Sequence, residues 1–190
     1  MAPKKPPVPA KSLSAEDWEV AALEALAERG MEGVAVQPLA RRLQVTKGSF
    51  YWHFADRDAL LKAALARWEQ GHTERVIDLV SAESDPRERL KKLLGLVLVG
   101  RGDRIYIALA ASDEPAVRAA LARVAKRRIR YLEECFIALG ERGASAARSA
   151  LLAYTVYVGL VHLRLEAPRE LPTRDAMPEQ IDHILERLLR

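Results

Sequence analysis

The chain has 190 residues, enough for a full hydrophobic core in one or two domains, and 49% of them are hydrophobic. Its single cysteine excludes an internal disulfide and a zinc site built from a cysteine cluster, and we expect neither a metal nor a cofactor. The net charge of +4 is compatible with a polyanionic partner but is too small to identify one.

The first segment of the chain, residues 1–12, contains four prolines and three lysines. No apolar run follows the lysines, so we expect a disordered basic tail rather than a signal peptide. The most apolar stretches, near 93–99 and 151–165, are interrupted by glycine and by polar or basic residues. We therefore expect no membrane-spanning segment, no membrane partner and a cytoplasmic location.

The first two helices have recognisable boundaries. Ser14 and Asp17 have the spacing of a capping box, which predicts a helix start, and Gly30 is suited to the left-handed backbone that ends a helix. Pro38 is predicted to be the first residue of a second, short helix that ends near Leu43.

A three-residue segment, 44–46, then separates two short helices, which is the length of the turn in a helix-turn-helix unit. Thr46 is predicted to cap the third helix, at about 47–54. Within it Phe50 and Phe54 are i, i+4 partners and form an inward stripe. The residues that fall away from this stripe are Lys47, Gly48, Ser49, Trp52 and His53.

Everything after the third helix has a helical pattern, beginning with a long helix that Asp56 is predicted to cap. Further helices are expected at about 86–100, up to 111, at 114–139, at 144–166 and before 190. The predicted fold class is all-α with about nine helices. The predicted divisions are a tail at 1–12, a helix-turn-helix DNA-binding domain at 13–58, and a helical effector-binding and dimerisation domain at 59–190.

The outward residues of the third helix suit DNA. A helix of this size fits the major groove, where Lys47 can reach a phosphate or a guanine edge and Ser49 can bond either. Trp52 can pack on a sugar or a thymine methyl group. The alternative is that Tyr51, Trp52 and His53 pack under a neighbouring helix, as in trihelical units that do not bind DNA.

These residues resemble the DNA-binding signature of the TetR/AcrR-type bacterial transcriptional repressors over about 50 N-terminal residues. The similar segments are 39–40, 45–48, 50–54 and 58–61. The resemblance implies base contacts from Gln37, Lys47, Gly48, Ser49 and Trp52, phosphate contacts from Tyr51, His53 and Arg57, and a capping role for Thr46. Gln44 departs from the family, which usually has glycine at this left-handed position of the turn.

The resemblance also implies a homodimer joined through the last two helices, and hence a palindromic double-stranded DNA operator. The apolar residues that suit this interface are Leu151, Tyr154, Val158, Val161, Ile181, Ile184, Leu185 and Leu188. The alternative is that these stripes belong to the core of one chain.

An effector pocket among the middle helices, roughly 86–165, is a further implication. The candidate lining residues are Leu94, Val97, Leu98, Tyr106, Leu109, Phe136, Tyr157 and His162. An unknown small molecule would bind there and displace the fourth helix near Trp68 and His72, which would weaken operator binding.

The function expected from the sequence is thus that of a ligand-responsive homodimeric repressor. An architectural DNA-binding protein without a small-molecule effector is the alternative. We expect no enzyme, because no catalytic arrangement is visible. Cys135 is expected to be a buried inert thiol, with an oxidant sensor as the alternative.

Overall fold

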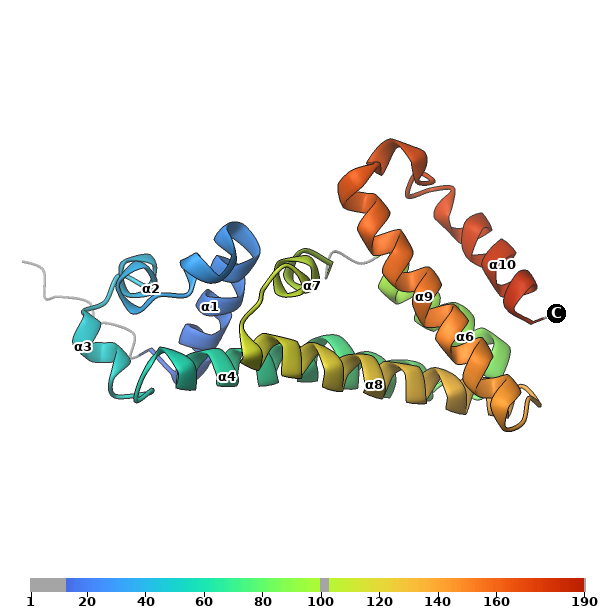
Figure 1. Ribbon diagram of the computed structural model, residues 1–190, viewed down its shortest axis with the longest axis horizontal. Helices are drawn as coiled ribbons and strands as arrows, with labels where there is room; N and C mark the ends of the chain where they lie inside the picture. The colour runs from blue at the N-terminus through green and yellow to red at the C-terminus, as the bar shows by residue number, and fades with distance from the viewer. Residues whose placement is uncertain (1–12, 100–102, 190) are drawn as a thin grey trace, which may run out of the picture.

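The computed structural model describes residues 13–99 and 103–189, and these residues form an all-helical chain, as predicted (Figure 1). The predicted tail at 1–12 lies outside the described residues. The α-helices are α1 (Ala15–Arg29), α2 (Val36–Arg42), α3 (Lys47–Phe50), α4 (Arg57–Glu69), α5 (Arg75–Ser81), α6 (Pro86–Val99), α7 (Asp103–Ala110), α8 (Pro115–Ala138), α9 (Ala144–Glu166) and α10 (Met177–Leu188).

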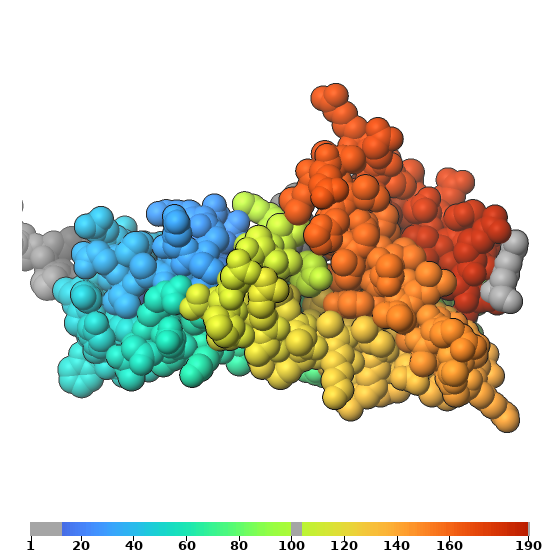
Figure 2. Space-filling view, viewed as in Figure 1, coloured from blue at the N-terminus to red at the C-terminus, as the bar shows by residue number. Residues whose placement is uncertain are grey.

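The molecule is elongated, with α1–α3 at one end and α10 at the other (Figure 1, Figure 2). Helices α4 and α8 pack together along the long axis and join the two ends. A π-helical turn, Gln70–Glu74, connects α4 directly to α5, so these two helices form one interrupted rod. Counted as one, they bring the described helices to the expected nine.

The predicted capping box at the start of α1 is confirmed. The Ser14 hydroxyl accepts a bond from the Asp17 backbone N–H at 3.3 Å, and the Asp17 carboxylate accepts one from the Ser14 backbone N–H at 2.7 Å. At the other end of α1, Gly30 has φ of 66°, the left-handed value that a glycine adopts without strain. Asp56 caps α4 as predicted, by accepting a bond from the Ala59 backbone N–H at 2.8 Å.

Two predicted boundaries were wrong. Helix α2 begins at Val36, so Pro38 is its third residue, which is tolerated because N–H groups in the first turn have no intrahelical acceptor. Helix α3 ends at Phe50, and the predicted segment 51–54 forms a turn instead. Thr46 precedes α3 in an extended conformation, but its side chain makes no capping hydrogen bond.

Two groups of buried side chains make up the core. The first joins α1–α4 to α7 and the N-terminal half of α8, while the second joins α5, α6, α9 and α10 to the C-terminal half of α8. The N-terminal helices therefore share their core with the beginning of the long helix α8. Trp18, Phe50 and Trp68 are among the largest fully buried side chains of the first group.

Gly33 lies where the chain after α1 returns against it, and no side chain fits there. A Cβ atom at this position would be 2.5 Å from the carbonyl oxygen of Ala25, a backbone atom that cannot rotate away. We expect Gly33→Ala to lower the free energy of unfolding by about 1–3 kcal/mol, measured by urea denaturation.

Gly95→Ala is the matched control for this substitution. Gly95 lies inside α6, and a Cβ atom there meets nothing within 4 Å. Alanine is the better helix former, so this variant should be as stable as the wild type or up to about 1 kcal/mol more stable. Equal stability of the two variants would show that the contact at Gly33 relaxes without cost.

Candidate nucleic-acid interface and ligand cavity

The turn between α2 and α3 contains a left-handed backbone position that is unfavourable for its glutamine. Gln44 has φ of 58°, the only positive value at a non-glycine residue in 13–99 and 103–189. The next residue, Val45, donates its backbone N–H to the carbonyl of Ala40 at 2.9 Å and closes the turn. The predicted left-handed position is confirmed, and glutamine occupies it at a cost of about 1–2 kcal/mol.

Helix α3 is anchored from below by aromatic rings. Phe50 is fully buried, with its ring centroid 5.3 Å from that of Trp18 in an edge-on arrangement. Phe54 is also buried, 5.7 Å from Phe50. The predicted inward stripe is therefore confirmed, and it fixes α3 on α1.

The opposite face of this unit is open to solvent. Trp52 is 88% exposed and Tyr51 56% exposed, so these two rings do not pack under a neighbouring helix. Exposed surface is unusual for a tryptophan in a chain whose other two are fully buried. Of the remaining predicted DNA contacts, the exposed ones are Gln37, Thr46, Lys47 and Gly48, and the half-buried ones are Ser49 and His53.

Arg57, predicted to bind phosphate, makes two hydrogen bonds within the protein. Its Nε donates to the carbonyl of Val34 at 2.7 Å, and its Nη1 donates to the carboxylate of Glu114 at 3.2 Å. Glu114 precedes α8. The half-buried guanidinium thus joins the start of α4 to the segment before α2 and to α8, and its charge is partly neutralised by Glu114.

The helix-turn-helix unit and its flanking helices match a known protein family. The sequence profile described as "Bacterial regulatory proteins, tetR family" matches residues 20–64, which span α1 to α4. A segment of 57 residues is 44% identical to the tetracycline repressor protein class A from transposon 1721 of Escherichia coli. That alignment covers 30% of this chain, and it covers 26% of the repressor, so the chain matches about a quarter of this curated relative's length.

The fold of the whole chain is similar to solved structures of transcriptional regulators. A TetR-family member from Streptomyces coelicolor A3 has a TM-score of 0.70 at 25% identity, covering 92% of this chain and 97% of its own. A transcriptional regulator from Rhodococcus sp. Rha1 has a TM-score of 0.71 at 22% identity, covering 93% and 94%. Residues 20–64 therefore carry the DNA-binding domain of the tetR family, with a helix-turn-helix unit at α2–α3, and the whole chain has a fold that members of this family share.

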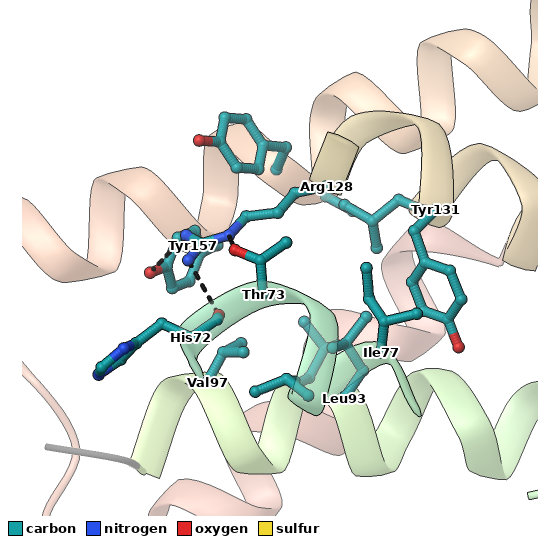
Figure 3. A pocket seen from close by; sticks show the side chains of 13 residues that line it. His72, Thr73, Ile77, Leu93, Val97, Arg128, Tyr131 and Tyr157 are labelled. Carbon is teal, nitrogen blue, oxygen red and sulfur yellow. Dashed lines mark hydrogen bonds between the residues drawn. The ribbon is translucent and has the colours of Figure 1, made fainter. Parts of the chain in front are cut away.

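The helical part that follows this domain contains a mostly apolar cavity of about 50 Å³ at the π turn, between α5, α6, α8 and α9 (Figure 3). Its lining residues are His72, Thr73, Val76, Ile77, Leu93, Leu94, Val97, Arg128, Tyr131, Leu132, Ala153, Tyr154 and Tyr157. The volume corresponds to roughly three or four water molecules, so a larger ligand requires the lining side chains to separate.

Three of the predicted pocket residues, Leu94, Val97 and Tyr157, line this cavity. The others do not. Leu98, Leu109 and Phe136 are fully buried in the packed core, and His162 is exposed on α9. The ring of Tyr106 lies 6.2 Å from that of the lining residue Tyr157. Helical periodicity indicates which residues point into the core, but it does not indicate which of them line a cavity.

The polar side of the cavity centres on Arg128, which the sequence interpretation missed. Its Nε donates to the Thr73 hydroxyl at 3.1 Å, its Nη1 to the Tyr157 hydroxyl at 3.2 Å and its Nη2 to the His72 carbonyl at 3.1 Å (Figure 3). The guanidinium also lies 5.9 Å from the Trp68 ring centroid. Arg128 belongs to the basic run 126–130, in which alternation around the helix turns one member inward.

The other titratable groups of the cavity are uncharged at neutral pH. Burial lowers the pKa of His72 below its usual value, and the nearby Arg128 lowers it further, against the opposing effect of the Trp68 carbonyl. Burial raises the pKa values of Tyr131, Tyr154 and Tyr157 above the ordinary phenol value. Arg128 is therefore the charged group of the cavity lining.

Most of the predicted dimer residues are already covered within one chain. The buried ones are Val161, Ile181, Ile184, Leu185 and Leu188; Tyr154 borders the cavity, and Val158 is half-buried. For these buried residues the intrachain alternative is the correct one, because α10 packs its apolar face on α6 and α9. Leu151 alone of the predicted set is exposed, at 54%.

Helix α9 nevertheless has exposed leucines, namely Leu151, Leu152, Leu163 and Leu165. In the space-filling view α9 forms part of the surface of the C-terminal half (Figure 2). By length and composition alone α9 could cross a membrane, a test that core helices of helical bundles also pass. Its other face packs on α8 through small buried residues such as Ala146, Ala150 and Ala153, which is the arrangement of a helix in a bundle.

Cys135 is buried in the second core group, and burial raises the pKa of its thiol. A raised pKa keeps the sulfur protonated and unreactive, which supports the inert thiol over the oxidant sensor.

Proposed function

We propose that this tetR-family regulator is a homodimeric repressor that binds a palindromic operator and is released from it by a small molecule. The observation that carries the proposal is the exposed face of Lys47, Tyr51 and Trp52, held rigidly by the buried Phe50 beneath it. Residues 13–58 form the DNA-binding part of the proposal and residues 59–190 the effector and dimer part, acting in the cytoplasm.

In this proposal α3 enters the major groove of DNA. Lys47 and Ser49 reach base edges or phosphates at the start of α3, and Gly48 allows close approach because it has no side chain. Tyr51 and His53 contact phosphates, and Gln37 reads a base from the start of α2. Arg57 already bonds Val34 and Glu114 through Nε and Nη1, so in this proposal it would meet a phosphate with its remaining guanidinium N–H donors.

The cavity supports a ligand-responsive regulator over an architectural DNA-binding protein. Helix α4 leads from the helix-turn-helix unit straight into the π turn, whose His72 and Thr73 border the cavity. A ligand that binds more tightly when the π turn is displaced would shift α4 and change the separation of the two α3 helices of a dimer. The sequence that the chain shares with the tetracycline repressor protein supports repression rather than activation.

The test of DNA binding is a gel shift with the promoter region upstream of the protein's own gene. Lys47→Ala and Tyr51→Ala are each expected to weaken binding by about 5- to 150-fold, since each removes a phosphate or base contact worth about 1–3 kcal/mol. Lys126→Ala, which removes an exposed lysine from α8, is the control and should bind as the wild type does. Wild-type affinity in both interface variants would refute the proposal.

The architectural alternative has a separate outcome. If the promoter complex forms as expected, but no compound that binds the protein releases the DNA, the chain regulates without a small-molecule effector. Release by any one compound, at a concentration that also raises the midpoint of thermal unfolding, excludes that alternative.

A further inference from the structure

Arg128 differs from the other arginines of α8 in having no carboxylate partner. Arg123 pairs with Glu69, Arg127 with Glu74 and Arg130 with Glu134. For Arg128 no carboxylate oxygen lies within 4.0 Å in the described ranges 13–99 and 103–189. Its three hydrogen bonds go to neutral groups, namely two hydroxyls and one backbone carbonyl.

An unpaired charge in such surroundings is costly. Most of the side chains that line the cavity are apolar, and the titratable groups there, His72 and the three tyrosines, are uncharged at neutral pH. Removing a cation from water without a counter-charge is unfavourable, and hydroxyl and carbonyl dipoles offset this only in part. The cavity therefore has a net positive charge that an anion would neutralise.

We propose that the ligand of this cavity is a small monocarboxylate with a compact apolar body. A carboxylate can accept two parallel N–H bonds from a guanidinium, which has further donors beyond the three now in use. A single positive charge matches a monoanion, whereas a dianionic phosphate would keep an uncompensated charge among Ile77, Leu93 and Val97. The apolar body would contact these side chains.

This ligand class rests on the proposed function for its regulatory meaning, and it gives that function a mechanism. A carboxylate on Arg128 competes with the His72 carbonyl and the Thr73 hydroxyl, which both belong to the π turn. Loss of these bonds frees the turn that connects α4 to α5. The cavity is also too small for most ligands without separation of its walls, so occupancy and displacement of the π turn occur together.

The experiment is isothermal titration calorimetry of the full chain with matched probes. The carboxylates are propanoate, hexanoate and benzoate, each compared with its neutral amide, and benzylamine serves as the cationic probe. At least one carboxylate is expected to bind about tenfold or more tightly than its amide, with no binding of benzylamine. Equal affinity for the acid and amide forms, tighter binding of benzylamine, or no binding of any carboxylate overturns the proposal.

Arg128→Met and Arg127→Met form the matched pair of variants. Both remove one half-buried arginine from the same helix, but Arg127 pairs with Glu74 and does not line the cavity. We expect Arg128→Met to weaken carboxylate binding about tenfold or more and Arg127→Met to leave it unchanged. Tyr157→Phe keeps the guanidinium and frees one of its donors, so it should bind the carboxylate at least as well as the wild type.

The comparison of probes on the wild type decides the question even if Arg128→Met fails to fold. Failure of the ligand class and failure of the proposed function also give different results. Carboxylate binding without release of promoter DNA confirms the ligand class and refutes its role as effector. Release of the DNA by a neutral or cationic compound alone preserves the proposed function and refutes the ligand class.

Discussion

Phe50→Ala is expected to lower the free energy of unfolding by about 3–5 kcal/mol, the usual cost of removing a buried phenylalanine ring. Phe50 is fully buried and contacts Trp18 edge-on, with Phe54 on its other side. Because Phe50 is the buried residue of the four-residue helix α3, the cavity left by the substitution would also loosen α3 from its fixed position. DNA binding should therefore be lost together with stability.

Trp52→Ala provides the matched control, two residues away on the opposite face. Trp52 is 88% exposed, so its removal should change the free energy of unfolding by less than about 0.5 kcal/mol. It should still weaken operator binding, because the exposed ring faces the proposed groove contact. The two variants thus separate the ring that supports the helix from the ring that touches DNA.

Urea denaturation followed by circular dichroism measures the stability of both variants, and a gel shift measures their DNA binding. A Phe50→Ala variant as stable as the wild type would show that α3 is held by other contacts. A Trp52→Ala variant with full operator affinity would remove Trp52 from the proposed interface while leaving the structural role of Phe50 intact.

The features that the sequence predicted well are local ones. The capping box at Ser14, the cap at Asp56 and the i, i+4 pair of Phe50 and Phe54 each depend on residues within four positions of one another. The left-handed backbone at Gln44 was expected from the family resemblance, because the family usually has glycine at this position of the turn. Such features do not depend on which helices pack together later.

The features that were missed depend on packing between distant segments. The amphipathic stripe of α10 predicts a buried face, but it does not show whether the same chain or a second copy covers it, and here α6 and α9 do. The inward turn of Arg128 toward the cavity depends on the position of the π turn beside α8, some 55 residues away in sequence. The bond between Arg57 and Glu114 was not foreseen either, because it joins residues 57 positions apart.

The exposed leucines of α9 lead to the second large predicted effect, which concerns the assembly of the protein. A substitution of both Leu151 and Leu163 by glutamate is expected to convert the proposed dimer into a monomer. Both leucines are at least 40% exposed in one chain, and a second copy packed face to face would cover them. In a two-fold interface each substitution occurs twice, so four leucine side chains are lost and four charges are introduced.

Covering a leucine side chain contributes about 1.5–3 kcal/mol, so the dissociation constant of the dimer should rise by at least about a hundredfold. Sedimentation equilibrium measures this directly. Leu79→Glu is the matched control, since Leu79 is equally exposed but lies on α5, outside the proposed interface, and this variant should remain dimeric. A wild-type chain that sediments as a monomer, or a double variant that remains a dimer, would contradict the proposed interface.

Loss of the dimer should also weaken operator binding, although the substitutions lie on α9, in the other half of the molecule from α3 (Figure 1). A palindromic operator has two half-sites, and a dimer binds the second half-site at a high effective concentration once the first is occupied. A monomer lacks this advantage, so the double variant should bind the whole operator no better than an isolated half-site. The wild type should distinguish the two DNAs, and equal binding of both by the wild type would show that each chain acts alone.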